Sequence, residues 1–310
     1  MTGWSVTDIP EQAGRRAVVT GANSGLGYVT ARELARKGAR VVLACRSEAR
    51  GRDAVQRMRR EVPEADVEVG RLDLGDLASV RNFAELFTRE YDRLDLLVNN
   101  AGVMAPPYGT TADGFETQFG VNHLGHFALT GLLLPALLAA PDARIVTVSS
   151  MMHALANIDI DDLNSEGRYR RWIAYARSKS ANLLFTHELA RRLAGHGGEV
   201  VAAAAHPGYA DTNLQSAGPR SEGRRGAEWL MGIGNRVFAQ SAEAGALPSL
   251  YAATAPDVRP DSFFGPAFGG WRGAPAPSWR ARWTLSDPAA RRLWEESARL
   301  TGVEYGALKA

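Results

Sequence analysis

Short apolar runs rich in β-branched residues alternate along the chain with longer segments whose apolar residues recur at the helical period. The runs cover residues 17–20, 40–45, 67–72, 94–99, 144–149 and 199–205. The helical segments cover residues 26–37, 48–61, 77–91, 115–138 and 172–193. Runs that are apolar on both faces predict a parallel sheet covered by helices on both sides. Right-handed crossovers then give a doubly wound α/β sheet, with its ligand crevice at the carboxyl ends of the strands.

The alternation stops after residue 205. Residues 207–240 are rich in Gly, Ser and Arg around an apolar patch, which is typical of a substrate lid, although a packed excursion fits equally well. The aromatic-rich segment 262–310 predicts a C-terminal extension with an edge strand near Ser262 and a last helix over 287–300. Because the chain shows no linker or repeat, we expect a single domain over residues 1–310.

Composition narrows the class of protein. The 310 residues are 45% hydrophobic with a net charge of +2, and no basic tract is interleaved with aromatics, so nucleic-acid binding has no support. Cys45 is the single cysteine, which excludes an internal disulfide. The N-terminus lacks a signal-peptide pattern, and the apolar stretch 128–140 is too short to span a membrane. We expect a cytoplasmic protein whose apolar segment 115–138 is a core or dimer helix rather than a membrane-lying one.

The first apolar run leads directly into the glycine-rich sequence TGANSGLG, residues 20–27. Glycines at these spacings allow a tight turn, close approach of the backbone to a pyrophosphate and close packing of helix on strand. Free N–H groups at the helix start then bind phosphate oxygens. The residues expected to contact the nucleotide are Gly21, Asn23, Ser24, Gly25, Leu26 and Gly27.

The end of the second apolar run distinguishes the two nicotinamide cofactors. A carboxylate there would bind the ribose 2′-hydroxyl, whereas an arginine accommodates a 2′-phosphate. The run ends Ala44-Cys45-Arg46-Ser47, without a carboxylate. We therefore expect NADP(H) rather than NAD(H), with Arg46 on the phosphate. The alternative is that Arg46 is one more solvated arginine.

Tyr175 and Lys179 lie four residues apart in a helical segment, so both side chains reach one face. Lysine is rare here, at positions 37, 179 and 309 only, which suggests that position 179 requires a compact ammonium. A fixed positive charge favours phenolate and lowers the pKa of a phenol toward the range of acid–base catalysis. The alternative is an ordinary surface pair on an amphipathic helix.

An ordered set of motifs makes the chain similar to the short-chain dehydrogenase/reductase family. The motifs are TGANSGLG (20–27), LDL (72–74), NNAG (99–102), VNHLGHF (121–127), VSS (148–150), YARSK (175–179) and PGYADT (207–212). Within the family the chain resembles the retinol-dehydrogenase-like branch, through ACRS (44–47), VNHLGHFALT, the long span before the tyrosine, and FFGPAFGG (263–270).

The resemblance implies a Rossmann sheet and interconversion of a carbonyl and an alcohol. It assigns Tyr175 as general acid and base, and Lys179 as the group that lowers its pKa and binds the nicotinamide ribose. Ser150 would stabilise the developing oxyanion, with Ser149 as the alternative serine. Asn122 would anchor a relay water, or it could cap or bridge backbone groups.

The resemblance also assigns further cofactor contacts. They are Asp73, Leu74, Asn100, Ala101, Gly102, Pro207, Gly208 and Thr212. Asn100 could instead stabilise a strand end, and Asp73 could be a solvated loop carboxylate. By analogy, pairing of the helices at 115–138 and 172–193 would give a homodimer or homotetramer.

Apolar residues near these motifs indicate a lipophilic small-molecule substrate. They are Met104, Met151, Met152, Tyr209 and the aromatic C-terminal segment. Two rival hypotheses are a catalytically idle NADP(H)-binding sensor or scaffold, and reduction of C=C bonds. A metal site on His123 and His126 lacks coherent further ligands. A hydrolase built on Ser150 with His153 or His206 lacks a nucleophile elbow.

Overall fold

The computed structural model of the protein describes residues 3–197, 199–208 and 241–308. Its centre is one eight-stranded sheet with the order β3-β2-β1-β4-β5-β6-β7-β8. The strands are β1 (Arg16–Thr20), β2 (Arg40–Cys45), β3 (Val67–Arg71), β4 (Leu96–Asn99), β5 (Arg144–Val148), β6 (Val201–Ala205), β7 (Phe263–Phe268) and β8 (Arg272–Pro277). The first seven pair in parallel, and β8 runs antiparallel to β7. The predicted doubly wound sheet is confirmed.

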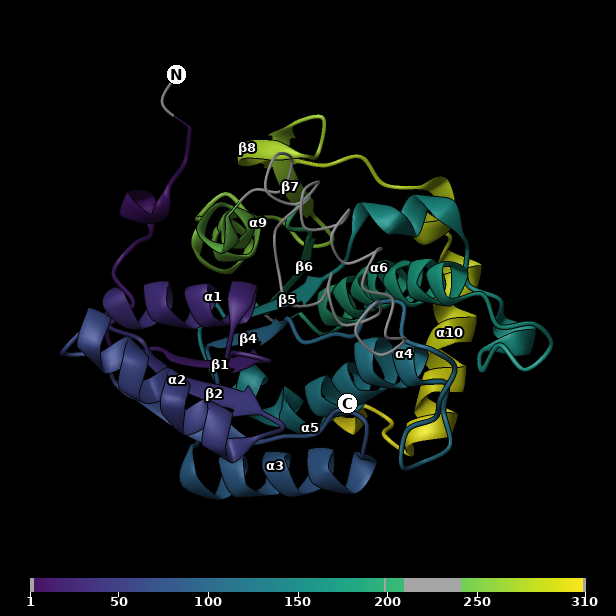
Figure 1. Ribbon diagram of the computed structural model, residues 1–310, viewed down its shortest axis with the longest axis horizontal. Helices are drawn as coiled ribbons and strands as arrows, with labels where there is room; N and C mark the ends of the chain where they lie inside the picture. The colour runs from purple at the N-terminus through teal and green to yellow at the C-terminus, as the bar shows by residue number, and fades with distance from the viewer. Residues whose placement is uncertain (1–2, 198, 209–240, 309–310) are drawn as a thin grey trace, which may run out of the picture.

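Helices cover both faces of the sheet (Figure 1). They are α1 (Gly25–Arg36), α2 (Glu48–Glu61), α3 (Leu77–Glu90), α4 (Thr117–Phe119), α5 (Gly125–Leu138), α6 (Arg171–His196), α9 (Ala242–Thr254) and α10 (Asp287–Thr301). One apolar core joins α1, α2 and α9 to the sheet, and a second joins α3, α5, α6 and α10 to it. The strands are therefore apolar on both faces because each face packs against its own helical layer.

The segment predicted as one helix over 115–138 is divided in three. Between α4 and α5 lies η2 (Gly120–Leu124), a π-helical turn. The combined segment Thr117–Leu138 is long and apolar enough to cross a membrane, and 72% of its most apolar window is buried. Burial against the rest of the chain accounts for this apolar composition, as in a core helix.

The C-terminal segment corrects one detail of the sequence analysis. The strand predicted near Ser262 is β7, but it lies between β6 and β8, so β8 is the edge strand. Pro275 and Pro277 within β8 suit an edge position, where a missing N–H costs no ladder bond. The predicted last helix is α10, whose Trp294 packs against Phe127 and Phe185 of α5 and α6.

Thr212, Tyr209 and most of the predicted lid 207–240 lie outside the described residues. A short 3-10 helix, η3 (Met151–Leu155), follows β5 and leads into the insert that precedes α6.

Candidate active site

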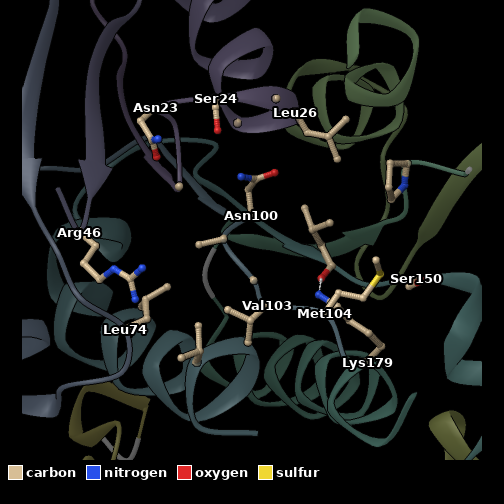
Figure 2. Close-up of a pocket in the computed structure, with 18 of the residues that line it drawn as sticks. Asn23, Ser24, Leu26, Arg46, Leu74, Asn100, Val103, Met104, Ser150 and Lys179 are labelled. Carbon is tan, nitrogen blue, oxygen red and sulfur yellow. Dashed lines mark hydrogen bonds between the residues drawn. The ribbon is translucent and has the colours of Figure 1, made fainter. Parts of the chain in front are cut away.

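A cleft of about 500 Å³ opens at the carboxyl ends of the parallel strands. Figure 2 shows Arg46 and Leu74 at one end, Asn100 in the middle, and Ser150, Met104 and Lys179 at the other. We call the first the cofactor end and the second the catalytic end. The lining includes all but two of the site residues predicted from the sequence: Asn122 lies behind it, and Thr212 lies outside the described residues.

The cofactor end is shaped by glycines. Gly21 and Gly25 have φ of +67° and +56°, a region that favours glycine. A Cβ on Gly27 would lie 2.7 Å from the Gly21 carbonyl oxygen and 2.5 Å from Asn100 Nδ2. Ser24 stands at the N-cap of α1 without a side-chain capping bond, so the backbone N–H groups there remain for a ligand. This is a cradle suited to a pyrophosphate.

Basic residues border the same end of the cleft. Arg46, Ser47 and Arg50 follow β2 and line the cleft together. Ser47 and Arg50 were not predicted as site residues from the sequence, although both stand at the start of α2, directly after Arg46. Two guanidinium groups and a hydroxyl suit a phosphate monoester better than a bare ribose hydroxyl.

Asp73 and Asn100 line the cleft while also bonding to the backbone. Asp73 Oδ1 accepts the N–H of Gly75 at 2.9 Å. Asn100 Nδ2 donates to the carbonyl of Thr20 at 2.8 Å, so its side chain joins the ends of β4 and β1. The alternative considered for Asn100, that its side chain stabilises a strand end, therefore agrees with the structure. Leu74, Ala101, Gly102, Pro207 and Gly208 complete the predicted lining that the structure describes.

At the catalytic end the structure brings Ser150, Tyr175 and Lys179 together. Tyr175 and Lys179 are 9% and 4% exposed, so neither is an ordinary surface residue. Ser150 and Tyr175 line the same end of the cleft, and the Ser150 hydroxyl is near enough to the phenol to lower its pKa. Ser149 instead donates its hydroxyl to the Lys179 carbonyl oxygen at 2.8 Å. Of the two serines, Ser150 is the one that faces the tyrosine.

The pKa of Tyr175 moves opposite to the sequence expectation. Burial raises the pKa of this phenol to about 12, and the nearby Ser150 hydroxyl opposes that rise. Lys179 donates to the Val148 carbonyl oxygen at 3.1 Å, and its Nζ lies 5.7 Å from the tyrosine ring centroid. Burial also lowers the pKa of Lys179, to about 8. Desolvation sets the direction of both shifts because both groups are inside the protein.

Asn122 lies behind the catalytic end in the π-helical turn and is fully buried. Its side chain accepts from Val103 N–H at 2.8 Å, donates to the Val103 carbonyl at 3.0 Å and donates to Ser178 Oγ at 2.9 Å. The side chain therefore bridges backbone and hydroxyl groups, as the alternative reading proposed. A Cβ on Gly102 would lie 3.1 Å from Asn122 Oδ1 and 3.5 Å from Lys179 Nζ, so this glycine permits close packing.

Four histidines considered in the sequence analysis have structural partners. His123 contacts Ser297, and His126 contacts Thr20. His153 bonds to the Ser150 backbone carbonyl and to Ala281 N–H, while His206 bonds to Ser278 and Gly208. None of these bonds involves the Ser150 hydroxyl.

The wall beside the catalytic end is apolar. Val103, Met104, Val121, Met152 and Trp172 line it. Met151, which the sequence analysis placed with them, packs instead near Ser278, with its sulfur 3.9 Å from that hydroxyl. Val103, Val121 and Trp172 were not singled out from the sequence, because each carries an ordinary apolar side chain with no pattern of its own.

That insert is fixed to the cleft wall by Tyr169. Its hydroxyl donates to the Pro106 carbonyl at 2.8 Å and accepts from Gln118 Nε2 at 2.9 Å. Gln118 also donates to the Arg171 carbonyl and accepts from Ala105 N–H. These bonds set the position of Trp172 at the mouth.

Fold and cleft together define a nucleotide-dependent oxidoreductase of the doubly wound class. Residues 15–222 match the family described as short chain dehydrogenase, and the chain belongs to that family. It is 45% identical to human retinol dehydrogenase 13 over 96% of this chain and 87% of that protein. It is also 45% identical to human retinol dehydrogenase 12, over 94% of this chain and 88% of that protein.

Solved structures agree with this assignment. A crystal structure of an uncharacterized protein from Mycobacterium paratuberculosis is 47% identical, with a TM-score of 0.81 over 98% of this chain and 99% of that one. A protein from Beutenbergia cavernae, described as an NAD(P)-dependent gluconate 5-dehydrogenase with bound NADP at low occupancy, is 30% identical. Its TM-score is 0.59, over 78% of this chain and 90% of that one. The chain is therefore a short-chain oxidoreductase that acts on alcohol or carbonyl groups with a nicotinamide cofactor.

Proposed function

We propose that this enzyme is an NADP(H)-dependent reductase of lipophilic aldehydes or ketones, with Tyr175 as its proton donor. The observation that carries the proposal is the meeting of Ser150, Tyr175 and Lys179 at one end of a cleft whose other end carries Arg46 and Arg50.

NADP(H) is favoured by the residues that follow β2. Arg46, Ser47 and Arg50 provide two cations and a hydroxyl, and the strand end carries no carboxylate for a ribose 2′-hydroxyl. The Beutenbergia relative with bound NADP supports the same choice. When bound, the cofactor supplies the hydride, and the protein supplies position and electrostatics.

The side chains of the catalytic end suit reduction at neutral pH. With its pKa raised to about 12, Tyr175 keeps its proton and can donate it to a developing alkoxide. Ser150 stands beside that phenol and can donate a hydrogen bond to the same oxygen. Lys179 retains most of its charge near neutrality, since its pKa is about 8, and this charge favours an alkoxide or phenolate nearby. Alcohol oxidation, which needs the phenolate, is favoured only at more alkaline pH.

The substrate is inferred from the apolar wall. Met104, Met152 and Trp172 present a thioether and indole surface next to Tyr175, which suits an irregular apolar molecule. The relatives named retinol dehydrogenases support inclusion of retinal among the substrates tested.

A panel of carbonyl substrates followed by NADPH absorbance tests the proposal. We expect turnover of retinal and long-chain aldehydes, with a KM for NADPH at least about tenfold below that for NADH, as one charge-assisted bond provides. Arg46→Ala should remove most of this preference, whereas Arg52→Ala, an exposed arginine paired with Glu48 on the same helix, should preserve it. Turnover restricted to polar sugars would reject the apolar substrate, and NADH preference in wild type would reject the cofactor assignment.

A further inference from the structure

The proposed reaction makes no use of His126, a fully buried histidine in the first turn of α5. Both of its ring nitrogens are engaged. Nδ1 lies 3.0 Å from the Asn122 carbonyl oxygen, and Nε2 lies 2.9 Å from Thr20 Oγ1. These two partners belong to different parts of the site: Thr20 ends β1 before the glycine loop, and Asn122 lies behind the catalytic end.

The hydrogen-bond partners of His126 determine its tautomer. A carbonyl oxygen can only accept, so the proton must be on Nδ1, which donates to Asn122. Nε2 then carries a lone pair, and the Thr20 hydroxyl donates to it at 2.9 Å, the shorter of its two contacts with an acceptor, since the Val98 carbonyl oxygen lies at 3.4 Å. Burial lowers the pKa of His126 to about 4, in agreement with a neutral ring.

Donation to His126 orients the Thr20 hydroxyl. With its proton directed at the imidazole, both oxygen lone pairs are available, and they accept the N–H groups of Asn100 and Ala101 at 2.9 Å each. The Asn100 side chain returns a bond to the Thr20 carbonyl at 2.8 Å. These bonds hold the start of the glycine loop against the segment that follows β4, and both line the cofactor end.

The other nitrogen of His126 connects to the catalytic helix. Asn122, whose carbonyl accepts from Nδ1, donates its side-chain amide to Ser178 Oγ at 2.9 Å. Ser178 in turn donates to the backbone carbonyl of Tyr175 at 2.8 Å. Buried hydrogen bonds thus connect Thr20 through His126 to the backbone of Asn122, and the Asn122 side chain through Ser178 to the backbone of Tyr175.

We propose that His126 is a positioning residue that sets the distance between the nucleotide loops and the catalytic helix. The proposal rests on the proposed function. His126 is separate from the cleft lining and acts on the reaction only through Thr20 and Asn122. The rigid ring holds one donor and one acceptor that point in different directions, so a single side chain satisfies both partners at once.

Two substitutions separate the two bonds. His126→Asn keeps a donor at the place of Nδ1 and loses the acceptor for Thr20, whereas His126→Gln keeps an acceptor at the place of Nε2 and loses the bond to Asn122. We expect His126→Asn to raise the KM for NADPH about tenfold with kcat within about twofold, as for one buried hydrogen bond. His126→Gln should lower kcat about tenfold with the KM for NADPH within about twofold.

A cycle with Thr20 provides the matched control. Thr20→Ser keeps the hydroxyl and should preserve both parameters, and Thr20→Val should raise the KM for NADPH as His126→Asn does. The double variant Thr20→Val with His126→Asn should be no worse than either single one, because both remove the same bond.

A general structural role predicts a different result. If both His126 variants lose kcat and NADPH affinity in parallel with their melting temperature, the positioning role is wrong. Should the His126 variants fail to fold, Thr20→Val must raise the KM for NADPH and Ser178→Ala must lower kcat. Otherwise the inference is rejected. If the wild type is active but the variants show no separation of their effects on KM and kcat, this inference alone is overturned. A wild type that neither binds NADPH by fluorescence nor reduces a carbonyl overturns it together with the proposed function.

Discussion

The two ends of the cleft are constructed by different means. At the cofactor end, backbone at the strand termini forms the surface, and Gly21, Gly25 and Gly27 keep it open. At the catalytic end, the side chains of Tyr175 and Lys179 are enclosed within the fold and depend on specific hydrogen-bond partners. Changes in the shape of the glycine loop should therefore affect cofactor affinity, and loss of the Tyr175 hydroxyl should affect the rate of reaction.

The largest expected effect is that of Tyr175→Phe. Removal of the proton donor should lower kcat by about 10³-fold, within the usual range for general acid catalysis, and leave the dissociation constant for NADPH nearly unchanged. NADPH absorbance measures the rate, and NADPH fluorescence measures the affinity. Tyr251→Phe, which removes a hydroxyl bonded to Asp257 outside the cleft, is the control and should retain full activity. Full turnover by Tyr175→Phe would contradict the catalytic assignment.

A methyl group on Gly27 tests the cofactor end by itself. Its Cβ would lie 2.7 Å from a backbone oxygen of Gly21, so the loop must shift. We expect Gly27→Ala to weaken NADPH binding by about tenfold to a hundredfold, from an overpacking cost of about 1–3 kcal/mol. Gly195→Ala, where an added Cβ would meet no atom within 4 Å beyond its own helix, should bind NADPH as wild type does. Equal affinities for the two variants would show that loop shape does not limit binding.

The same difference explains which parts of the molecule could be predicted from the sequence. The first six strands and the glycine loop follow from local patterns, because two-sided burial and positive φ each demand particular residues. The meeting of Ser150 with Tyr175 followed from the family motifs rather than from local chemistry. The pKa of Tyr175 could not be predicted from its distance to Lys179 in the sequence, since it depends on burial by residues from the whole chain.

Other features depended on tertiary structure in the same way. Strand β8 contains Pro275, Pro277 and Gly273, which disfavour a strand by propensity and are accommodated because β8 is an edge. The π-helical turn at Asn122 leaves no pattern in an apolar segment. Arg50 was missed because only the packing of α2 shows that it lines the cleft beside Arg46.

The pH dependence of NADPH binding tests whether the charge of Lys179, at the catalytic end, contributes to cofactor affinity. Burial lowers the pKa of Lys179 to about 8, so in the free enzyme its charge is present below this pH and is lost above it. An anionic dinucleotide should therefore bind about tenfold more weakly as the pH rises through about 8. The 2′-phosphate is already ionised above about pH 7, so the charge of the ligand does not change over this range. The dissociation constant for NADPH, measured by fluorescence between about pH 7 and about pH 10, checks this. Lys179→Met should bind weakly throughout and show no inflection near pH 8; an inflection that persists belongs to another group.

The smallest expected effect concerns the support of the catalytic helix. His187 on α6 contacts Asp261 at 2.6 Å and Asp287 at 2.8 Å. These two contacts connect α6 to the C-terminal part of the chain. The hydrogen bond to Asp261 leads the rise of the pKa of His187 above its usual 6.5, and Asp287 adds to it. Because the folded-state pKa is raised, the stabilisation is complete below the unfolded value and declines as the pH rises through the folded one.

His187→Gln should therefore lower the melting temperature by about 2 °C at about pH 6, and by less at alkaline pH. The affinity for NADPH should be unchanged, because His187 does not line the cleft. A loss of stability that grows with pH would reverse the assigned sign and show that His187 is neutral in the folded protein. A loss of NADPH affinity would show instead that the support of α6 by Asp261 and Asp287 also affects the cofactor end.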